Sequence, residues 1–196
     1  MPDGAARIGP GLALLRETRH WLPAVHAVWP GWRPVRAGAF DKTAAQNWSV
    51  PWHQDRVIAM AERLDVPGFS NWSDRSGYWH CSPSLDVLED MLFVRVHLDA
   101  SLRECGGMQI AVGSHSLGHI RAGDVDTTLA TCRAEDTDAA PGDILVLHML
   151  TLHRSCPSQT AVPRRVIRFD LARKDLPGGL RWAVDDAVVH GTPAAR

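Results

Sequence analysis

The sequence predicts a mainly β protein, built as a sandwich or jelly roll with an N-terminal helical cap. After residue 33 the chain consists of many short apolar stretches that are separated by Gly, Pro and Asp. Helical spacing of apolar residues is strong only before that point. Strands do not alternate with long helices, so nothing in the pattern indicates a parallel sheet.

Length and composition agree with one globular domain over residues 1–196. Apolar residues make up 45% of the chain and charged residues 22%, as in ordinary soluble proteins. The net charge of -1 gives no general attraction for nucleic acid or an anionic membrane surface. No apolar run is long enough to cross a bilayer, and residues 1–11 lack the features of a signal peptide. We therefore expect a cytoplasmic protein, monomeric or homodimeric, with no nucleic-acid or membrane partner.

The helical cap is expected at residues 1–32, because Leu15, Leu22 and Val25 fall at helical spacing. Pro23 should divide this run into two short helices. The jelly-roll core is expected at residues 33–175. Its candidate strands are residues 35–40, 47–55, 92–99, 109–112, 143–148 and 165–171. Further helix is expected at residues 84–90 and after Gly123.

Residues 65–84 are predicted to form a long loop that acts as a lid. The segment is rich in Gly, Pro and Ser, yet it holds Phe69, Trp72, Tyr78 and Trp79. A long loop in a compact domain is usually functional or disordered, and aromatic residues favour the functional reading. Trp72 and Trp79 are the residues of this segment that we expect to contact a substrate.

Two His-x-Asp pairs are candidates for a metal site, His53 with Asp55 and His97 with Asp99. On a strand, residues i and i+2 point the same way, so each pair places two ligands side by side. Two imidazoles and one carboxylate on one face of a metal are typical of Fe(II) oxygenases. The second pair also fits a polar strand face opposite an apolar stripe at residues 92–98, and spacing alone does not eliminate it.

The C-terminal part of the chain supplies a third ligand and an anion-binding residue. A strand region leading to His153 is followed, after a gap of hairpin length, by a strand that opens with Arg164. 2-Oxoglutarate chelates iron through its keto-acid end, and an arginine fork can pair with its far carboxylate through two hydrogen bonds. His148 is the rival third ligand, although its apolar strand fits a core histidine better. Arg165 is expected on the opposite strand face, and Arg168 beyond the pocket.

Three motifs of this chain resemble those of the phytanoyl-CoA dioxygenase family. The first ends in His-Gln-Asp at residues 53–55. The second is a Gly-Gly turn, a strand and a Gly-Ser-His sequence, all within residues 106–118. The third is a histidine with a serine two residues later and an arginine eleven residues later, matched by His153, Ser155 and Arg164. The motifs stand in the family's order and span residues 40–172, most of the chain.

The resemblance implies a double-stranded β-helix, a cupin-like jelly roll with short N-terminal helices packed outside it. The iron ligands that it implies are His53, Asp55 and His153, which favours the first His-x-Asp pair. The residues that it implies for binding or lining the 2-oxoglutarate pocket are Arg164, Ser155, Gln54 and Trp72. The residues that it places at the cavity, within reach of a substrate, are Arg95 and His97.

The predicted function is therefore that of an Fe(II)- and 2-oxoglutarate-dependent oxygenase. Such an enzyme uses O2 to hydroxylate an unactivated C–H of a small-molecule substrate and releases succinate and CO2, with ascorbate as an activator in vitro. Asp55 argues against halogenation, which requires that the carboxylate be replaced so that halide can bind the metal. The alternative is a non-redox, cupin-like isomerase or ligand-binding protein, which would have no need of Arg164.

Overall fold

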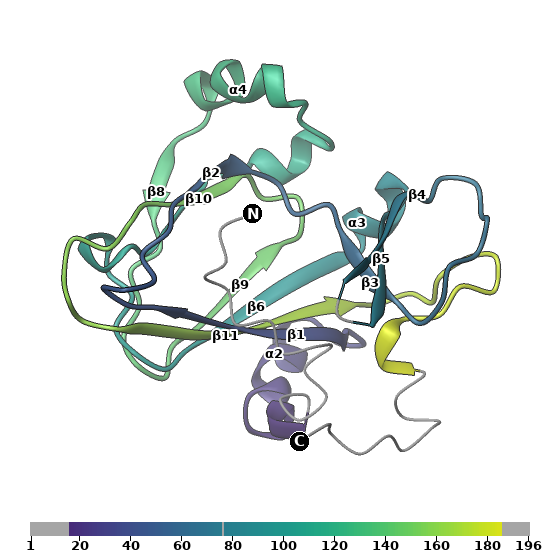
Figure 1. Cartoon of the computed structure of the whole chain (residues 1–196), viewed down its shortest axis with the longest axis horizontal. Helices are drawn as coiled ribbons and strands as arrows, with labels where there is room; N and C mark the ends of the chain where they lie inside the picture. Colours follow the sequence, from purple (N-terminus) through teal and green to yellow (C-terminus); the bar gives the residue numbers. More distant parts are fainter. Residues whose placement is uncertain (1–15, 76, 186–196) are drawn as a thin grey trace. The chain divides into compact units, whose positions relative to one another are not determined.

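The computed structural model describes residues 16–75 and 77–185 (Figure 1). Contacts between residues divide this chain into two compact units, each assembled from segments that lie far apart in the sequence. The first unit contains Ala39–Asp55 and Leu92–Arg168. The described part of the second unit consists of residues 16–38, Arg56–Met91 and residues 169–185.

Two four-stranded sheets form the jelly roll. The strand order of the first is β1 (Arg33–Lys42), β11 (Arg164–Ala172), β6 (Met91–His97) and β9 (Ile144–His148). The strand order of the second is β2 (Val50–His53), β10 (His153–Ser155), β7 (Met108–Ala111) and β8 (Ala134–Asp136). Each sheet interleaves strands from early and late in the chain, which is the connectivity of a jelly roll. The predicted mainly β fold is confirmed, and β1 and β11 contribute residues to both units.

Within the first unit, the inner faces of the two sheets meet at an aromatic contact. The ring of Phe93 on β6 lies 5.3 Å from the ring of His153 on β10. Alternation along β6 places Arg95 and His97 on the same face as Phe93, and both are buried. These two residues therefore point into the jelly roll and do not form a polar outer face. Leu98, expected to complete the apolar stripe, lies beyond the strand and is 44% exposed.

The segment at residues 65–84 is a β-hairpin and not the long loop that the sequence predicted. Its strands belong to a third sheet, with the order β3 (Ile58–Met60), β5 (Tyr78–Ser82) and β4 (Ser70–Arg75). Gly77 closes the turn at φ 80°, and its N–H donates to the Asp74 carboxylate at 3.1 Å. Strand β4 is polar, and its sequence shows no alternation of apolar and polar residues. It is a strand because it pairs with β5, which its own sequence pattern does not predict. The lid function of this segment stays a prediction.

The helices are short, as expected. They are η1 (Arg16–His20), α2 (Leu22–Val28), α3 (Leu85–Glu89) and α4 (Val125–Thr131), with 3₁₀ turns η2 (Arg103–Cys105), η3 (Ser114–Leu117) and η4 (Ala122–Asp124). Pro23 lies in the first turn of α2, where its missing N–H is tolerated, so the helical run breaks at Trp21 instead. The Trp21 ring packs on Phe169 of β11 at 4.6 Å. The first part of the predicted helical cap, residues 1–15, lies outside the described residues.

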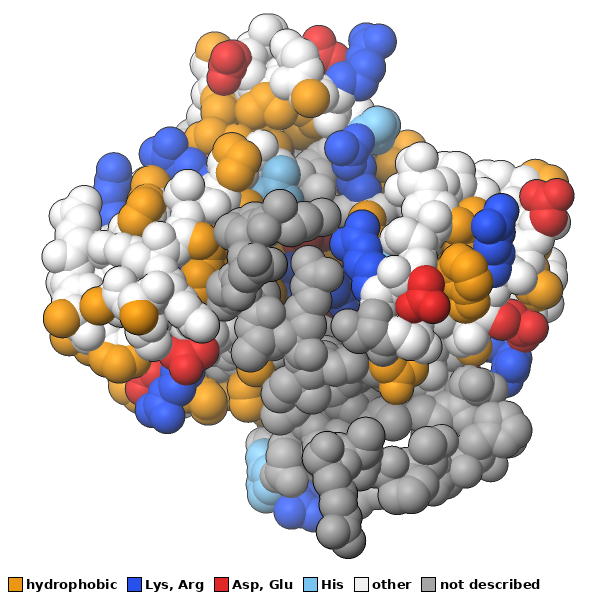
Figure 2. Space-filling model, viewed as in Figure 1, with side chains coloured by type: hydrophobic (Ala, Val, Ile, Leu, Met, Phe, Trp, Pro, Cys, Tyr) orange, Lys and Arg blue, Asp and Glu red, His pale blue; other side chains and the backbone are white. Residues whose placement is uncertain are grey.

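The described surface agrees with the near-zero net charge. On the face shown in Figure 2, acidic and basic side chains are interspersed with apolar ones. None of the helices at residues 16–75 and 77–185 has the length and apolar character needed to cross a membrane.

Candidate active site

Two histidines face each other across neighbouring strands of the second sheet. His53 on β2 and His153 on β10 are paired residues of the antiparallel ladder, so their side chains emerge on the same face. Their ring centroids are 4.3 Å apart. Asp55 follows β2 by two residues, and one ligand atom from each of the three residues lies within 4.8 Å of the others. The structure thus brings together the three residues that the sequence proposed as metal ligands.

Hydrogen bonds fix which ring nitrogen of each histidine is free. His53 Nδ1 is 2.9 Å from the Pro51 carbonyl oxygen, and His153 Nδ1 is 2.8 Å from that of Thr151. Because a carbonyl oxygen only accepts, Nδ1 carries a proton, and in the neutral form of each ring the lone pair is therefore on Nε2. Burial lowers the pKa of His153 to about 4, against a smaller opposing effect of Asp55, so this ring is neutral at pH 7. Neutral imidazoles held through Nδ1 in this way are the usual form of metal-ligating histidine.

Asp55 completes the group as an ionised carboxylate. One oxygen, Oδ2, lies 3.4 Å from His153 Nε2, and the other, Oδ1, lies 3.9 Å from His53 Nε2. Burial raises the pKa of Asp55, but the Arg168 guanidinium together with the two histidines outweighs this and holds the pKa well below its usual range. Two neutral nitrogens and one carboxylate oxygen form the donor set of a two-histidine, one-carboxylate metal site.

Arg168 lies in the site, and the prediction that it falls beyond the pocket is wrong. Its Nη1 donates to Asp55 Oδ2 at 2.7 Å, and its guanidinium lies over the Phe93 ring at 4.5 Å from the centroid. Alternation along β11 places Arg164, Val166 and Arg168 on one face. That spacing was readable in the sequence and would have identified Arg168 as an inward-facing cation.

The rival ligands do not join the group. His97 is 2% exposed, and neither of its ring nitrogens has a hydrogen-bond partner, but it lies outside the cluster of three. Asp99 accepts two bonds from the side chain of Arg165, at 2.9 Å each. His148 stacks on His115 with ring centroids 5.1 Å apart. Among the described residues, the geometry therefore favours the pair formed by His53 and Asp55.

Arg164 is a buried cation with no ion-pair partner among the described residues. It opens β11, is 2% exposed, and its Nε and Nη1 atoms have no hydrogen-bond partner in the described chain. Burial lowers the pKa of this guanidinium, which remains charged at neutral pH. Ser155 lies on β10 two residues after His153, so its side chain emerges on the same face as that ligand. By contrast, Arg165 is exposed and bonded to Asp99, as the sequence led us to expect of the opposite face.

Two more buried cations accompany Arg164. The pKa of Arg95 is lowered to about 9, chiefly by burial and to a smaller extent by the positive charges of Arg164 and Arg168. The pKa of Lys42 is likewise lowered to about 8, chiefly by burial and to a smaller extent by the positive charges of Arg164 and Arg95. Lys42 is fully buried and donates to the Cys156 carbonyl oxygen at 2.7 Å. The interior of the first unit is therefore strongly basic, although the whole chain is almost neutral.

The Gly-Gly turn leaves room for Lys42. Gly106 has a φ of +71°, and a Cβ atom there would lie 2.7 Å from the Cys156 carbonyl oxygen and 2.9 Å from Lys42 Nζ. Any larger residue would displace the lysine or the carbonyl group to which it donates. This contact gives the second sequence motif a physical role in shaping the basic interior.

The side chain of Gln54 forms hydrogen bonds with three backbone groups. Its Nε2 donates to the carbonyl oxygens of Gly118 and Leu150 at 2.8 Å each, and its Oε1 accepts from the Ile120 N–H at 2.9 Å. This bonding favours a structural role between the two metal ligands over the expected contact with 2-oxoglutarate. The sequence gave no sign of these partners, because all three are backbone groups more than sixty residues away.

Replacement of Gln54 by Ala should therefore lower the free energy of unfolding. Three backbone groups would lose their partners in the interior, and an unsatisfied buried group costs about 1–3 kcal/mol. For a chain of this size, each kcal/mol lowers the melting temperature by about 2–4 °C. Thermal melts monitored by circular dichroism give the measurement, with Gln46→Ala at an exposed position as the matched control. Equal melting of both variants and wild type would remove the structural role of Gln54.

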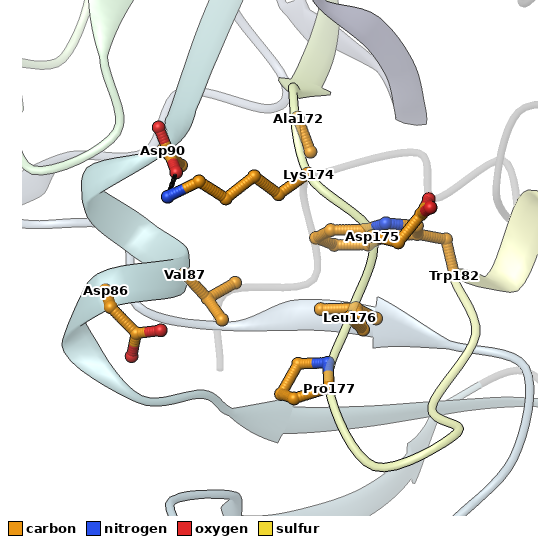
Figure 3. Close-up of a pocket in the computed structure, with 9 residues that line it drawn as sticks. All are labelled: Asp86, Val87, Asp90, Ala172, Lys174, Asp175, Leu176, Pro177 and Trp182. Atoms are coloured by element: carbon orange, nitrogen blue, oxygen red, sulfur yellow. Dashed lines mark ion pairs between the residues drawn. The ribbon is translucent and has the colours of Figure 1, made fainter.

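Trp72 belongs to the second unit. It lies on β4, and its ring meets that of Trp79 edge-on, with centroids 6.4 Å apart and an interplanar angle of 78°. Its expected contact with the 2-oxoglutarate pocket stays a prediction. The second unit also has a pocket of its own, of about 170 Å³, which is lined by apolar residues such as Val87 and Trp182 and by four charged ones (Figure 3). At its edge Asp90 is already paired with Lys174 and Arg173, and the metal-ligand group is not part of it.

The first unit has a larger pocket, of about 430 Å³. Ile110, which lines it, is the ladder partner of His153 on β7. Leu145, on the other side, is the ladder partner of Arg95 on β9. Adjacent residues such as Ile144 and Leu145 both line it, so its lining includes both faces of β9, and the metal-ligand group, Arg95 and Arg164 are not among its lining residues. Its volume falls in the range of small-molecule sites.

Several solved protein structures are similar in fold to this chain. AviO1 from Streptomyces viridochromogenes Tue57 is 20% identical with a TM-score of 0.56, and the match covers 85% of this chain but only 61% of AviO1. SnoN, described as a non-heme alpha ketoglutarate dependent epimerase from nogalamycin biosynthesis, is 18% identical with a TM-score of 0.56 (89% of this chain, 74% of SnoN). HygX from Streptomyces hygroscopicus, solved with nickel and 2-oxoglutarate bound, is 17% identical with a TM-score of 0.51 (88% of this chain, 72% of HygX).

Sequence comparison gives the family. No curated protein matched the sequence. The family model for phytanoyl-CoA dioxygenase (PhyH) matches residues 14–166, a span that includes the metal-ligand group and Arg164. The chain belongs to the phytanoyl-CoA dioxygenase family.

Proposed function

We propose that this protein is an Fe(II)- and 2-oxoglutarate-dependent oxygenase that hydroxylates an unactivated C–H bond of a small molecule. The observation that carries the proposal is Arg164, a buried guanidinium with two unpartnered nitrogens in the unit that holds His53, Asp55 and His153. A buried charge with no partner is unfavourable, so the site is built for an anion that arrives from outside. A cupin-like isomerase would have no need of such a residue.

The donor set fits a divalent iron ion. His53 and His153 would offer their Nε2 atoms, which the bonds of Nδ1 to backbone carbonyls leave free. Asp55 would offer a carboxylate oxygen while Arg168 holds the carboxylate in place. When bound, Fe(II) and 2-oxoglutarate activate O2 for oxidation of a C–H bond, with release of succinate and CO2. Three protein ligands leave room on the metal for the co-substrate and O2.

Arg164 would pair with the far carboxylate of 2-oxoglutarate. An arginine and a carboxylate form two parallel, charge-assisted hydrogen bonds, and this geometry recognises the co-substrate by its length and charge. The Ser155 hydroxyl, on the face of β10 that also carries His153, would add a third bond. The buried Phe93 excludes water from the His153 side of the site.

Succinate release is the direct test. The purified protein, stripped of metal and reconstituted with Fe(II) under anaerobic conditions, is given 2-oxoglutarate, ascorbate and O2, with and without a library of small molecules. Succinate should form slowly alone and faster with a substrate, and a product heavier by one oxygen atom should appear by mass spectrometry. Metal binding without 2-oxoglutarate binding or succinate formation would favour the cupin-like alternative.

The hairpin at residues 65–84 should become protected when the site is filled, if it acts as a lid. Limited proteolysis within this segment is expected to slow in the presence of metal, 2-oxoglutarate and substrate together, because closure would shield the segment from the protease. Cleavage rates are compared with those of the helix α4, which serves as the internal control. Identical cleavage of the hairpin in all states would exclude the lid.

A further inference from the structure

Arg95 is the second buried arginine of the first unit, and neither 2-oxoglutarate nor the metal accounts for it. It is 8% exposed and shares a strand face with Phe93, whose ring contacts the ligand His153. Its guanidinium carbon lies 5.6 Å from the centroid of the Phe40 ring, and its Nη1 is 3.6 Å from the Met108 sulfur. These neighbours are apolar or weakly polar, so they do not neutralise the charge.

The nearby carboxylates are already taken. Asp55 is bonded to Arg168, and among the described residues no carboxylate lies within 4.0 Å of the Arg95 guanidinium. The Nε atom of Arg95 has no hydrogen-bond partner. The neighbouring groups Arg164 and Arg168 are also cations and repel it. An arginine kept in such a place is strongly disfavoured unless an anion from outside joins it.

We propose that Arg95 binds an anionic group, a carboxylate or a phosphate, of the small-molecule substrate. The inference rests on the proposed function, which places one carboxylate of 2-oxoglutarate at the metal and the other at Arg164. With both ends of the co-substrate assigned, the remaining buried arginine is left for the substrate. The fork of a guanidinium pairs equally well with either type of oxyanion.

The pocket of about 430 Å³ lies in the same unit as Arg95. Two of its lining residues, Ile110 and Leu145, are the ladder partners of His153 and Arg95. Four carboxylates line it. Glu135 pairs with Arg133 at 2.7 Å, and Asp136 pairs with Arg103 at 3.1 Å. Asp138 and Asp143 accept hydrogen bonds from the backbone N–H groups of Arg103 and Ala140. An acidic substrate would be anchored by Arg95, with another part of the molecule directed at the metal.

The experiment separates the substrate from the co-substrate in two titrations. Nickel(II), which does not support turnover, is loaded into wild type, Arg95→Met and Arg154→Met. Each protein is first titrated with 2-oxoglutarate by calorimetry and then, at saturation, with inorganic phosphate as the anion probe. Arg154 is the matched control, because it lies on β10 on the face opposite His153 and bonds to Gln109 at 2.6 Å.

Wild type and Arg154→Met should bind phosphate in the presence of 2-oxoglutarate, and Arg95→Met should bind it at least about tenfold more weakly. The affinity of Arg95→Met for 2-oxoglutarate should stay within about threefold of wild type. A loss of 2-oxoglutarate affinity in Arg95→Met would assign Arg95 to the co-substrate and overturn the proposal. So would equal phosphate binding by all three proteins, or none by wild type. If wild type fails to bind 2-oxoglutarate, the proposed function fails instead, and the phosphate titration of nickel-loaded protein still reports on Arg95.

Two further measurements keep the test sound. Without ligands, Arg95→Met should melt no lower than wild type, because it removes an unpaired buried charge and keeps an apolar chain of similar length. A large fall in melting temperature would indicate a structural role for Arg95 and contradict the proposal. In the iron-loaded enzyme, small carboxylic acids are compared with their methyl esters. Acids and not esters should stimulate succinate release by wild type, and equal stimulation by both would overturn the inference.

Discussion

Alanine at His53, Asp55 or His153 is expected to remove most of the bound iron and with it the activity. Each of the three residues supplies one donor atom to a group that spans less than 5 Å. Changes to groups around a metal site commonly weaken binding by 10–100-fold, so loss of a ligand itself should exceed about 100-fold. Metal content of the purified variants, followed by nickel titration calorimetry, gives the measurement. Asp55→Ala should show the largest loss, since it also removes the carboxylate to which the Arg168 guanidinium donates.

Variants of the rival pair are the controls. His97→Ala and Asp99→Ala should keep their metal, because neither residue lies in the group of three and Asp99 is engaged with Arg165. His148→Ala should likewise keep it. If His97→Ala loses the metal while His53→Ala retains it, the wrong His-x-Asp pair has been assigned.

Removal of Arg164 is expected to weaken 2-oxoglutarate binding by at least about tenfold while the metal content stays near that of wild type. A charge-assisted contact contributes about 1.5–3 kcal/mol, and a carboxylate left unpaired in a buried site adds a desolvation penalty. Arg164→Lys should recover part of the loss, because an ammonium cannot reproduce the planar fork. The measurement is a 2-oxoglutarate titration with nickel held saturating.

Arg165→Ala is the matched control for Arg164. The two arginines are adjacent in sequence, but Arg165 is exposed and bonded to Asp99, whereas Arg164 is buried. Its affinity for 2-oxoglutarate should equal that of wild type. Arg168 does not serve as a control, since its bond to Asp55 couples it to the metal group. Wild-type affinity in Arg164→Ala would end the co-substrate assignment and favour a metal-binding jelly roll without turnover.

The sequence predicted those parts of the molecule that short-range pattern determines. Alternation identified β6, and the i, i+2 spacing placed His53 beside Asp55 before any fold was known. The thin helical signal at residues 84–90 and after Gly123 corresponds to the short helices α3 and α4. In each case the residues that carry the signal are neighbours in the sequence.

What the sequence missed depends on contacts between distant segments. Strand β4 is polar and becomes a strand through its partner β5. Gln54 is held by carbonyl and amide groups at residues 118–150, and such backbone partners leave no trace in residue types. Arg168 was misplaced for a different reason. Its face was readable from β11, but its nearness to Asp55 arises only when two sheets pack together.

The bonds that hold Nδ1 of His53 and His153 have a consequence for metal selectivity. They aim two nitrogens at a common point before any ion arrives, and together with one carboxylate oxygen this donor set suits most divalent first-row ions. Affinity for such a site rises from Mn²⁺ through Fe²⁺ to Ni²⁺ and Cu²⁺, so tighter-binding ions outcompete iron wherever they are free. The supply of metals in the cell, and not the shape of the site, would then decide which ion is loaded. A sample purified on a nickel column should carry nickel in place of iron until it is stripped with a chelator.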